Sequence, residues 1–488
     1  MRTARTSHRP GEGRGSGARA RTSIRIAALA ASFVLLVLAM GGAASGGQAA
    51  ATPPAGLGCE DSAATPVPQP TQEMLDAAGL GDLPLAPDSA RRDLVAGPFS
   101  DSTSVTNPLF PISELDSAIL NGHVDGKVFH TETTLLPFTK IIEWTPGQCV
   151  RVLLSQYMAF LDGRLQETAI DLYAQSDDGS VWYLGEDVHD YGTDGVILTT
   201  EGTWQAGLDG PLAMIMPSDP QVGDANRAEN LPGNSFEEVH IAATNRTFNG
   251  PSGPVSGGMV ATEIHQDAPP SDKLFAPGYG EFRSTDGPDV EAMALASPTD
   301  SLPGGVPAEL TTISNGADRI FDLPLATRAQ WVRAAHIARG MLAAWTTFRA
   351  GDVPPRLVQP TRVALRSLVS EIAARHRSKS HLASIDAAYA SNDLQLRYRP
   401  ATEVDTMRFD LWVRRALVHA TSGSLGGTRS DVVTLEWIRD RIAHTLDPVT
   451  LVRLDSLVGE LGAAVFDEDL AAAAQAARDL REVTSGLI

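Results

Sequence analysis

Five side chains that can bind a cation or transfer a proton fall within one short segment: Glu186, Asp187, His189, Asp190 and Asp194. Such carboxylates can bind calcium, and an acid with a raised pKa beside an ionised neighbour can act in acid–base catalysis. The spacing is not that of a calcium loop, however, and an Asp-Gly pair such as 194–195 is typical of a turn. The sequence therefore favours a hairpin with a solvated acidic edge over a metal site.

Aromatic side chains that could line a ligand pocket gather in the same part of the chain. They are Tyr157, Tyr173, Trp182, Tyr183 and Trp204. Aromatic residues of strands more often belong to the core or to cross-strand pairs, so this alternative stays open.

The predicted ligand site combines an apolar wall with polar groups that orient the ligand. Its residues are Tyr173, Trp182, Trp204, Glu186 and Asp187. Because successive side chains of a strand point to opposite faces, only one of Trp182 and Tyr183 can line a given cavity. We predict Trp182, since a tyrosine hydroxyl reaches water more readily at the outer face.

The sequence contains no familiar motif of a catalytic nucleophile. Gly-x-Ser-x-Gly, Ser-x-x-Lys, His-Glu-x-x-His and the phosphate loop are all missing. Histidines of the C-terminal part could bind a metal or haem, since helical bundles hold both: His336, His376, His381, His419 and His444. Three of them fall in predicted last turns of helices, where histidine stabilises exposed carbonyls. We expect no cofactor, no metal, and a binding protein rather than an enzyme; a secreted hydrolase or a metal-binding protein that uses carboxylates is the alternative.

The N-terminal residues 1–50 resemble an export signal. Seven arginines and one acid precede an uncharged run from Ile26 to Ala44. This pattern is typical of a cleaved signal peptide, although the run is long enough to remain as a membrane anchor. The positive-inside rule places the following residues outside the cytoplasm. We therefore expect a secreted or cell-envelope protein that meets the membrane only through this segment, if it stays uncleaved.

Two cysteines, Cys59 and Cys149, follow this segment. In an oxidising compartment two cysteines most simply form a disulfide. We predict a bond that ties the region around Cys59 to the start of a strand.

Acidic residues are unevenly distributed. Residues 51–324 carry 11 basic and 40 acidic side chains, whereas residues 325–488 carry 21 and 18. A strongly acidic domain repels nucleic acid and anionic lipid, and it can attract cations or a basic partner. A solvated, soluble surface is the simpler interpretation. We expect no nucleic-acid partner, and an unidentified small ligand or envelope protein instead.

The elements that must position these residues change character along the chain. Residues 51–106 are predicted to be a Pro/Ala-rich spacer with a short helix. Residues 107–320 contain β-type segments separated by Asp-Gly pairs, as at 125–126 and 162–163, which predicts an antiparallel meander in a barrel or sandwich. From residue 325 to residue 488 apolar residues recur with helical period. The predicted fold class is α+β in two domains, an acidic β-meander followed by an all-α helical bundle.

Several motifs of the β-type region resemble a group of uncharacterised bacterial secreted proteins and lipoproteins. They are NPLFP at 107–111, WYLGED at 182–187, EGTWQAG at 201–207, MPSDPQVGD at 216–224 and FAPGYG at 275–280. The resemblance covers about residues 107–284 and leaves out the helical half. It implies a domain type and an extracytoplasmic location, and it transfers no catalytic residue.

Overall fold

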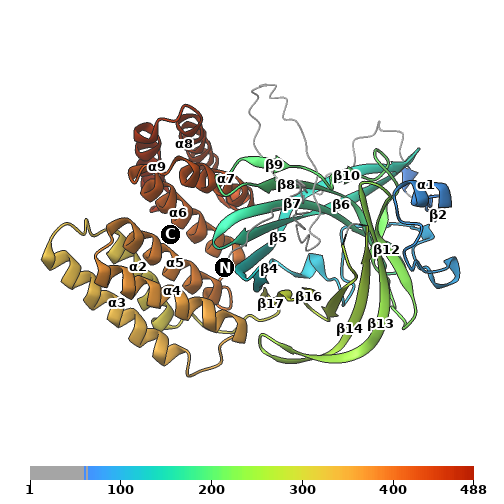
Figure 1. Cartoon of the computed structure of the whole chain (residues 1–488), viewed down its shortest axis with the longest axis horizontal. Helices are drawn as coiled ribbons and strands as arrows, with labels where there is room; N and C mark the ends of the chain where they lie inside the picture. The colour runs from blue at the N-terminus through green and yellow to red at the C-terminus, as the bar shows by residue number, and fades with distance from the viewer. Residues whose placement is uncertain (1–59, 62–63, 267) are drawn as a thin grey trace, which may run out of the picture.

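A curved antiparallel β-sheet followed by a group of helices makes up the chain (Figure 1). The computed structural model describes residues 60–61, 64–266 and 268–488. The predicted α+β class is confirmed, with the sheet in the N-terminal part and the helices in the C-terminal part.

The sheet consists of two meanders joined through their first and last strands. The first meander comprises β4 (Ser117–Val124), β5 (Lys127–Thr145), β6 (Gln148–Leu161), β7 (Arg164–Gln175) and β8 (Val181–Tyr191). The second comprises β12 (Ala225–Leu231), β13 (Ser235–Gly250), β14 (Gly253–His265), β15 (Ser271–Ala276), β16 (Gly280–Asp286) and β17 (Asp289–Ser297). Each strand pairs with the next, and β17 pairs with β4, so both meanders belong to one sheet.

Tight turns account for the long hairpins. Asp125 and Gly126 have φ values of 52° and 72°, and Asp162 and Gly163 have values of 49° and 73°. Two successive residues with positive φ match the right-handed twist of paired strands, which is why Asp-Gly suits these positions. The meander predicted from these pairs is confirmed.

The two ends of the sheet come close together without forming a continuous ladder among the described strands. Strands β9 (Ile197–Thr199), β10 (Trp204–Gln205) and β11 (Ala213–Met216) all pair with β8. From β12, Asn226 donates a side-chain hydrogen bond of 2.8 Å to the carbonyl of Met214 in β11. The sheet thus curls back on itself and remains open at this seam.

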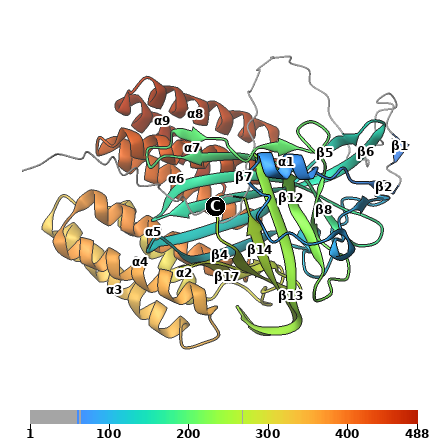
Figure 2. The same ribbon diagram turned by 45° about the vertical axis from the view of Figure 1, so that its right-hand side comes forward.

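Helices cover the outer face of the first meander, on one side of the sheet in both views (Figures 1 and 2). They are α2 (Ala308–Phe321), α3 (Arg328–Phe348), α4 (Pro355–Ala374), α5 (Arg377–Gln395), α6 (Ala401–Thr421), α7 (Leu425–Ile442), α8 (Pro448–Phe466) and α9 (Leu470–Thr484). Helix α2 begins at Ala308, inside the range 107–320 that we assigned to the β-domain, so the helical part begins earlier than predicted. Among the helices of the described residues, none has the length and hydropathy needed to cross a membrane.

The sheet and the helices share apolar cores. Phe160 of β6 stacks on Trp412 of α6 with ring centroids 5.7 Å apart. Ile119 of β4 and Leu295 of β17 are buried in one cluster with residues of α2 to α5. The two parts therefore pack as one body.

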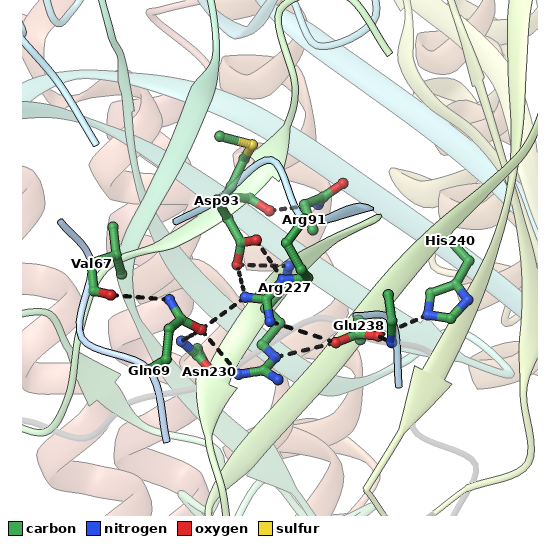
Figure 3. Close-up of polar contacts among 11 residues, drawn as sticks. Val67, Gln69, Arg91, Asp93, Arg227, Asn230, Glu238 and His240 are labelled. Atoms are coloured by element: carbon green, nitrogen blue, oxygen red, sulfur yellow. Dashed lines mark hydrogen bonds and ion pairs between the residues drawn. The ribbon is translucent and has the colours of Figure 1, made fainter. Parts of the chain in front are cut away.

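The predicted spacer is folded where the structure describes it. Residues 64–106 contain α1 (Gln72–Ala77) and bury Leu80, Ala96 and Phe99. A buried polar cluster attaches this segment to β12 and β13 (Figure 3). In it Gln69 accepts hydrogen bonds from Arg91 at 2.8 Å and Arg227 at 3.0 Å. The spacer interpretation is thus wrong for residues 64–106, because side chains of this segment make polar contacts with side chains of the sheet.

Two predictions fall on residues outside the described ranges. The export segment, residues 1–50, is one of them, and Cys59 is the other. Strand β1 (Glu60–Asp61) pairs with β6 and places Asp61 opposite Cys149. The disulfide between Cys59 and Cys149 stays a prediction.

Candidate ligand-binding cavity

A cavity of about 130 Å³ lies inside the curve of the sheet. Strands from both meanders line it, and residues 110–115 close part of it. Its apolar lining includes Phe110, Ile112, Leu115, Leu120, Leu135, Ile215, Phe275 and Met293. Its polar lining includes Thr133, Ser155, Tyr157, Asp171, Tyr173, Tyr183, Glu237, Lys273, Tyr279, Glu281 and Glu291. Because Glu281 lines the cavity and keeps 28% of its side chain exposed, we place the opening on its side.

Aromatic rings form one corner of the cavity. Tyr173 and Tyr183 face each other across β7 and β8 and stack with centroids 4.9 Å apart. Phe110 meets Tyr173 edge-on at 5.0 Å, and Trp204 meets Tyr183 edge-on at 5.5 Å. These contacts hold the rings in fixed positions beside the cavity.

A β-bulge brings two carboxyl groups to the Tyr183 hydroxyl. Asp171 pairs with Glu186 and Tyr173 pairs with Tyr183, so β8 contains one residue more than β7 between the two pairs. The extra residue turns Tyr183 and Glu186 to the same face. The Tyr183 hydroxyl lies 2.7 Å from Asp171 Oδ1 and 2.5 Å from Glu186 Oε2. Glu186 Oε1 accepts a further hydrogen bond of 2.8 Å from Trp204 Nε1.

Burial keeps protons on several of the inward-facing acids. Desolvation raises the pKa of Asp171 to about 7 and that of Glu291 to about 8. It also raises the pKa of Glu186 and of Glu229 well above the usual range, and neighbouring carboxylates add to both shifts. A buried carboxylate without a counter-ion is costly, so burial favours the protonated form of these groups and a nearby cation would favour the ionised form.

One ammonium group opposes this acidity. Lys273 Nζ lies 2.9 Å from Glu263 Oε1 and 3.4 Å from Glu281 Oε2, with its side chain 6% exposed. Nearby, Glu237 is paired with His265, whose Nδ1 lies 2.9 Å from Glu237 Oε1. Carboxyl groups therefore outnumber basic groups inside the sheet.

The predicted site residues separate into two sets. Tyr173 lines the cavity, while Glu186 and Trp204 are buried directly behind Tyr183. Trp182 does not line the cavity, so our choice of Trp182 over Tyr183 is wrong. Its ring is buried on the other face, where Nε1 donates a hydrogen bond of 2.9 Å to Ser176 Oγ.

Asp187 also lies away from the cavity. Its side chain is 37% exposed, and its Oδ1 lies 3.9 Å from His189 Nδ1. Burial raises the pKa of Asp187 to about 6, and nearby Lys140 opposes that shift. Ordinary alternation explains this separation, because Glu186 and Asp187 are consecutive residues in regular register and point to opposite faces.

The interpretation of the acidic residues as a solvated surface missed the acids that are buried inside the sheet. Asp171, Glu229, Glu237, Glu263 and Glu291 are each less than 9% exposed. Each of these acids stands in a strand whose inner face is buried, and alternation alone does not distinguish that face for Asp171, which shares its side of β7 with Glu167 and Gln175.

The histidines of the helical part do not assemble a site. His419 Nδ1 lies 2.5 Å from Asp431 Oδ2, and His381 Nε2 lies 3.0 Å from the carbonyl oxygen of Leu323. His376 Nδ1 lies 2.7 Å from Glu371 Oε2 on an exposed helix end. Each of these three histidines is paired with a carboxyl or carbonyl oxygen, which fits structural roles.

Comparison with known proteins does not assign the chain to a family. No protein-family model matches the chain, and no curated protein matches it. The resemblance to bacterial secreted proteins and lipoproteins stays a prediction.

Proposed function

We propose that this chain is an exported cell-envelope protein that binds a small amine, without catalysis, in the cavity of its sheet. The observation that carries the proposal is the cavity lining. Asp171, Glu237, Glu281 and Glu291 line it, and Lys273 is the only basic residue among its lining residues. A protonated amine supplies the charge that this lining lacks.

The aromatic corner supports the same class of ligand. Tyr157, Tyr173 and Tyr183 line the cavity together with the acids, and aromatic rings attract ammonium groups through their quadrupole. The apolar part of the lining, which includes Leu120, Leu135 and Met293, suits the hydrocarbon part of such a ligand.

Cavity size limits the ligand to a few heavy atoms. An apolar cavity of about 150 Å³ holds one benzene molecule. The cavity of about 130 Å³ therefore suits an amine the size of butylamine or tetramethylammonium.

The test compares amines with neutral molecules of matched shape. Butylamine and tetramethylammonium should raise the melting temperature of the purified protein, because a ligand of the folded state stabilises it. Butanol and tert-butanol should not raise it. Equal effects of the amine and the alcohol, or no effect of either, would exclude amine recognition.

Two variants locate the bound amine. Asp171→Asn and Glu291→Gln keep the shape of the protonated acids and remove one ionisable group each, so we expect each to weaken amine binding about tenfold, about 1.4 kcal/mol. Asp219→Asn, which changes an exposed acid, is the matched control and should bind as the wild type does. Unchanged affinity in both cavity variants would place the amine elsewhere.

A secreted hydrolase is the second candidate, and Asp171 is the observation that favours it. A cavity acid with a pKa of about 7 is suited to donate a proton at neutral pH. Turnover of glycoside or ester substrates, abolished by Asp171→Asn, would support this candidate over simple binding.

A further inference from the structure

A second polar site lies beside the cavity, across three neighbouring strands. Glu229 of β12 stands directly opposite Glu237 of β13, and Glu237 stands directly opposite His265 of β14. Glu263, two residues before His265, points to the same face of β14. Cross-strand pairing therefore fixes three carboxyl groups and one imidazole within a small buried volume.

We propose that Glu237, Glu263 and His265 bind a divalent transition-metal ion such as Zn²⁺. One ligand atom from each of the three lies within 4.8 Å of the other two. Two atoms bound to one zinc ion at about 2.1 Å are at most about 4.2 Å apart. Small side-chain movements are therefore enough to bring the three atoms onto one ion.

Unpartnered oxygens independently point to a cation here. Glu263 Oε2 has no hydrogen-bond partner among the described residues, although the side chain is only 2% exposed. It lies 3.7 Å from His265 Nε2, which is also 2.9 Å from Ser271 Oγ, so the Ser271 hydroxyl has to turn away when Nε2 binds the ion. Glu229 Oε1 is likewise buried without a hydrogen-bond partner in the described chain. Buried acceptors of this kind are costly unless an ion, a proton or a water satisfies them.

Charge also favours a divalent ion. Glu237, Glu263 and Glu281 surround a single ammonium group, that of Lys273. Lys273 already occupies Glu263 Oε1 at 2.9 Å and leaves Oε2 available. A mixed set of one nitrogen and two oxygens suits zinc better than calcium, which prefers oxygen alone.

A comparable group at the helix interface does not compete with this assignment. His130, Glu132 and Asp393 also bring ligand atoms together. There the carboxyl groups already accept from arginines, with Arg441 Nη1 at 2.6 Å from Glu132 and Arg408 Nη2 at 2.7 Å from Asp393. Those cations fill the positions that a metal ion would need.

The position of the site gives the ion an open side. Glu237 and Lys273 line the cavity, whereas Glu263 and His265 do not. A metal held here would retain a coordination position toward the cavity, as metal sites that bind ligands do.

The test uses the full chain after export, stripped with a chelator and loaded with Zn²⁺ or Co²⁺ alone. We expect one Zn²⁺ per chain by elemental analysis, and visible absorption of bound Co²⁺ that indicates a nitrogen and oxygen environment. Glu263→Gln and His265→Asn should each weaken binding by tenfold or more. Circular dichroism and melting temperature show whether each variant is folded.

His240→Asn is the matched control, because His240 pairs with Glu238 at 2.8 Å on the face of β13 opposite to that of Glu237. It should bind Zn²⁺ as the wild type does. No stoichiometric Zn²⁺, or binding that survives in the folded Glu263→Gln and His265→Asn variants, would overturn the proposal. Since no amine is present in this assay, and amine binding is measured on chelator-treated protein, the two proposals fail or succeed separately.

Discussion

Protonation of Asp171 couples the cavity to pH. Its side chain is buried and its carboxyl accepts the Tyr183 hydroxyl, while burial raises its pKa from 3.8 to about 7. Between these two values the folded state holds a proton that the unfolded state has lost. The contribution of Asp171 to stability is therefore fully present below about pH 4 and is lost as the pH rises to about 7.

Asp171→Asn should remove this dependence, since an amide resembles the protonated acid. Above about pH 7 the variant should be more stable than the wild type by up to about 4 kcal/mol, from about three units of pKa. Urea unfolding over a series of pH values measures the difference. Asp219→Asn should leave the slope unchanged, and an unaltered slope in Asp171→Asn would show that Asp171 is not the group responsible.

The residues that lie close together were easier to predict than the face of the sheet to which each side chain points. Tyr173, Trp204 and Glu186 were placed correctly near one another, because they stand in adjacent hairpins. Trp182 and Asp187 were not, since one extra residue in β8 puts Glu186 on the face of Tyr183, and both Trp182 and Asp187 point to the other face. Nothing in the local pattern marks that bulge except Gly185.

At the scale of the element, Gly185 makes the bulge possible. Its φ is +132°, and a Cβ atom there would lie 2.4 Å from the Trp204 carbonyl oxygen. Gly185→Ala should therefore lower stability by about 2–4 kcal/mol, through strain and through displacement of β10. Denaturant unfolding measures the loss, and changed tryptophan fluorescence would report the movement of Trp204.

Gly126→Ala is the matched control for this prediction. Gly126 has a φ of +72°, and a Cβ atom there would meet no atom within 4 Å other than those of its neighbours in the chain. The substitution should cost only about 1–2 kcal/mol, from positive φ alone. Equal losses of stability in the two variants would mean that the close approach of β10 does not restrict the residue at position 185.

At the scale of the whole molecule, a buried ionic network holds the helices on the sheet. Glu132 of β5 is completely buried, and Arg441 Nη1 of α7 donates to it at 2.6 Å. Arg408 Nε of α6 lies 3.4 Å from the same carboxyl group, and the Tyr389 hydroxyl of α5 donates to it. Three helices thus meet at one side chain of the sheet.

Removing Glu132 leaves two buried arginines with less counter-charge. We expect Glu132→Ala to lower the free energy of unfolding by about 3–5 kcal/mol. Glu403→Ala, which breaks the exposed pair with Arg399 at 3.0 Å, should cost less than about 0.5 kcal/mol. Comparable losses in the two variants, measured by chemical denaturation, would contradict a central role for Glu132.

The class of the fold could be predicted from the sequence, whereas the boundary between its parts could not. Asp-Gly turns and helical periodicity are local, and both identified the right elements. The boundary was placed at residues 320–325, yet α2 begins at Ala308 and packs with α3 and α5. Contacts such as Glu132 with Arg441 join residues far apart in the chain, and no local pattern reveals them.

The pairing of β4 with β17 also sets an order of events as the chain is made. Asn121 lies opposite Ala292, so one edge of β4 has no partner until nearly the whole sheet has been synthesised. Strands β4 to β8 can form hairpins early, because their contacts are between neighbours in the chain. Until β17 arrives, the open edge of β4 can pair with another chain, which makes this interval the one in which misassembly is most favoured.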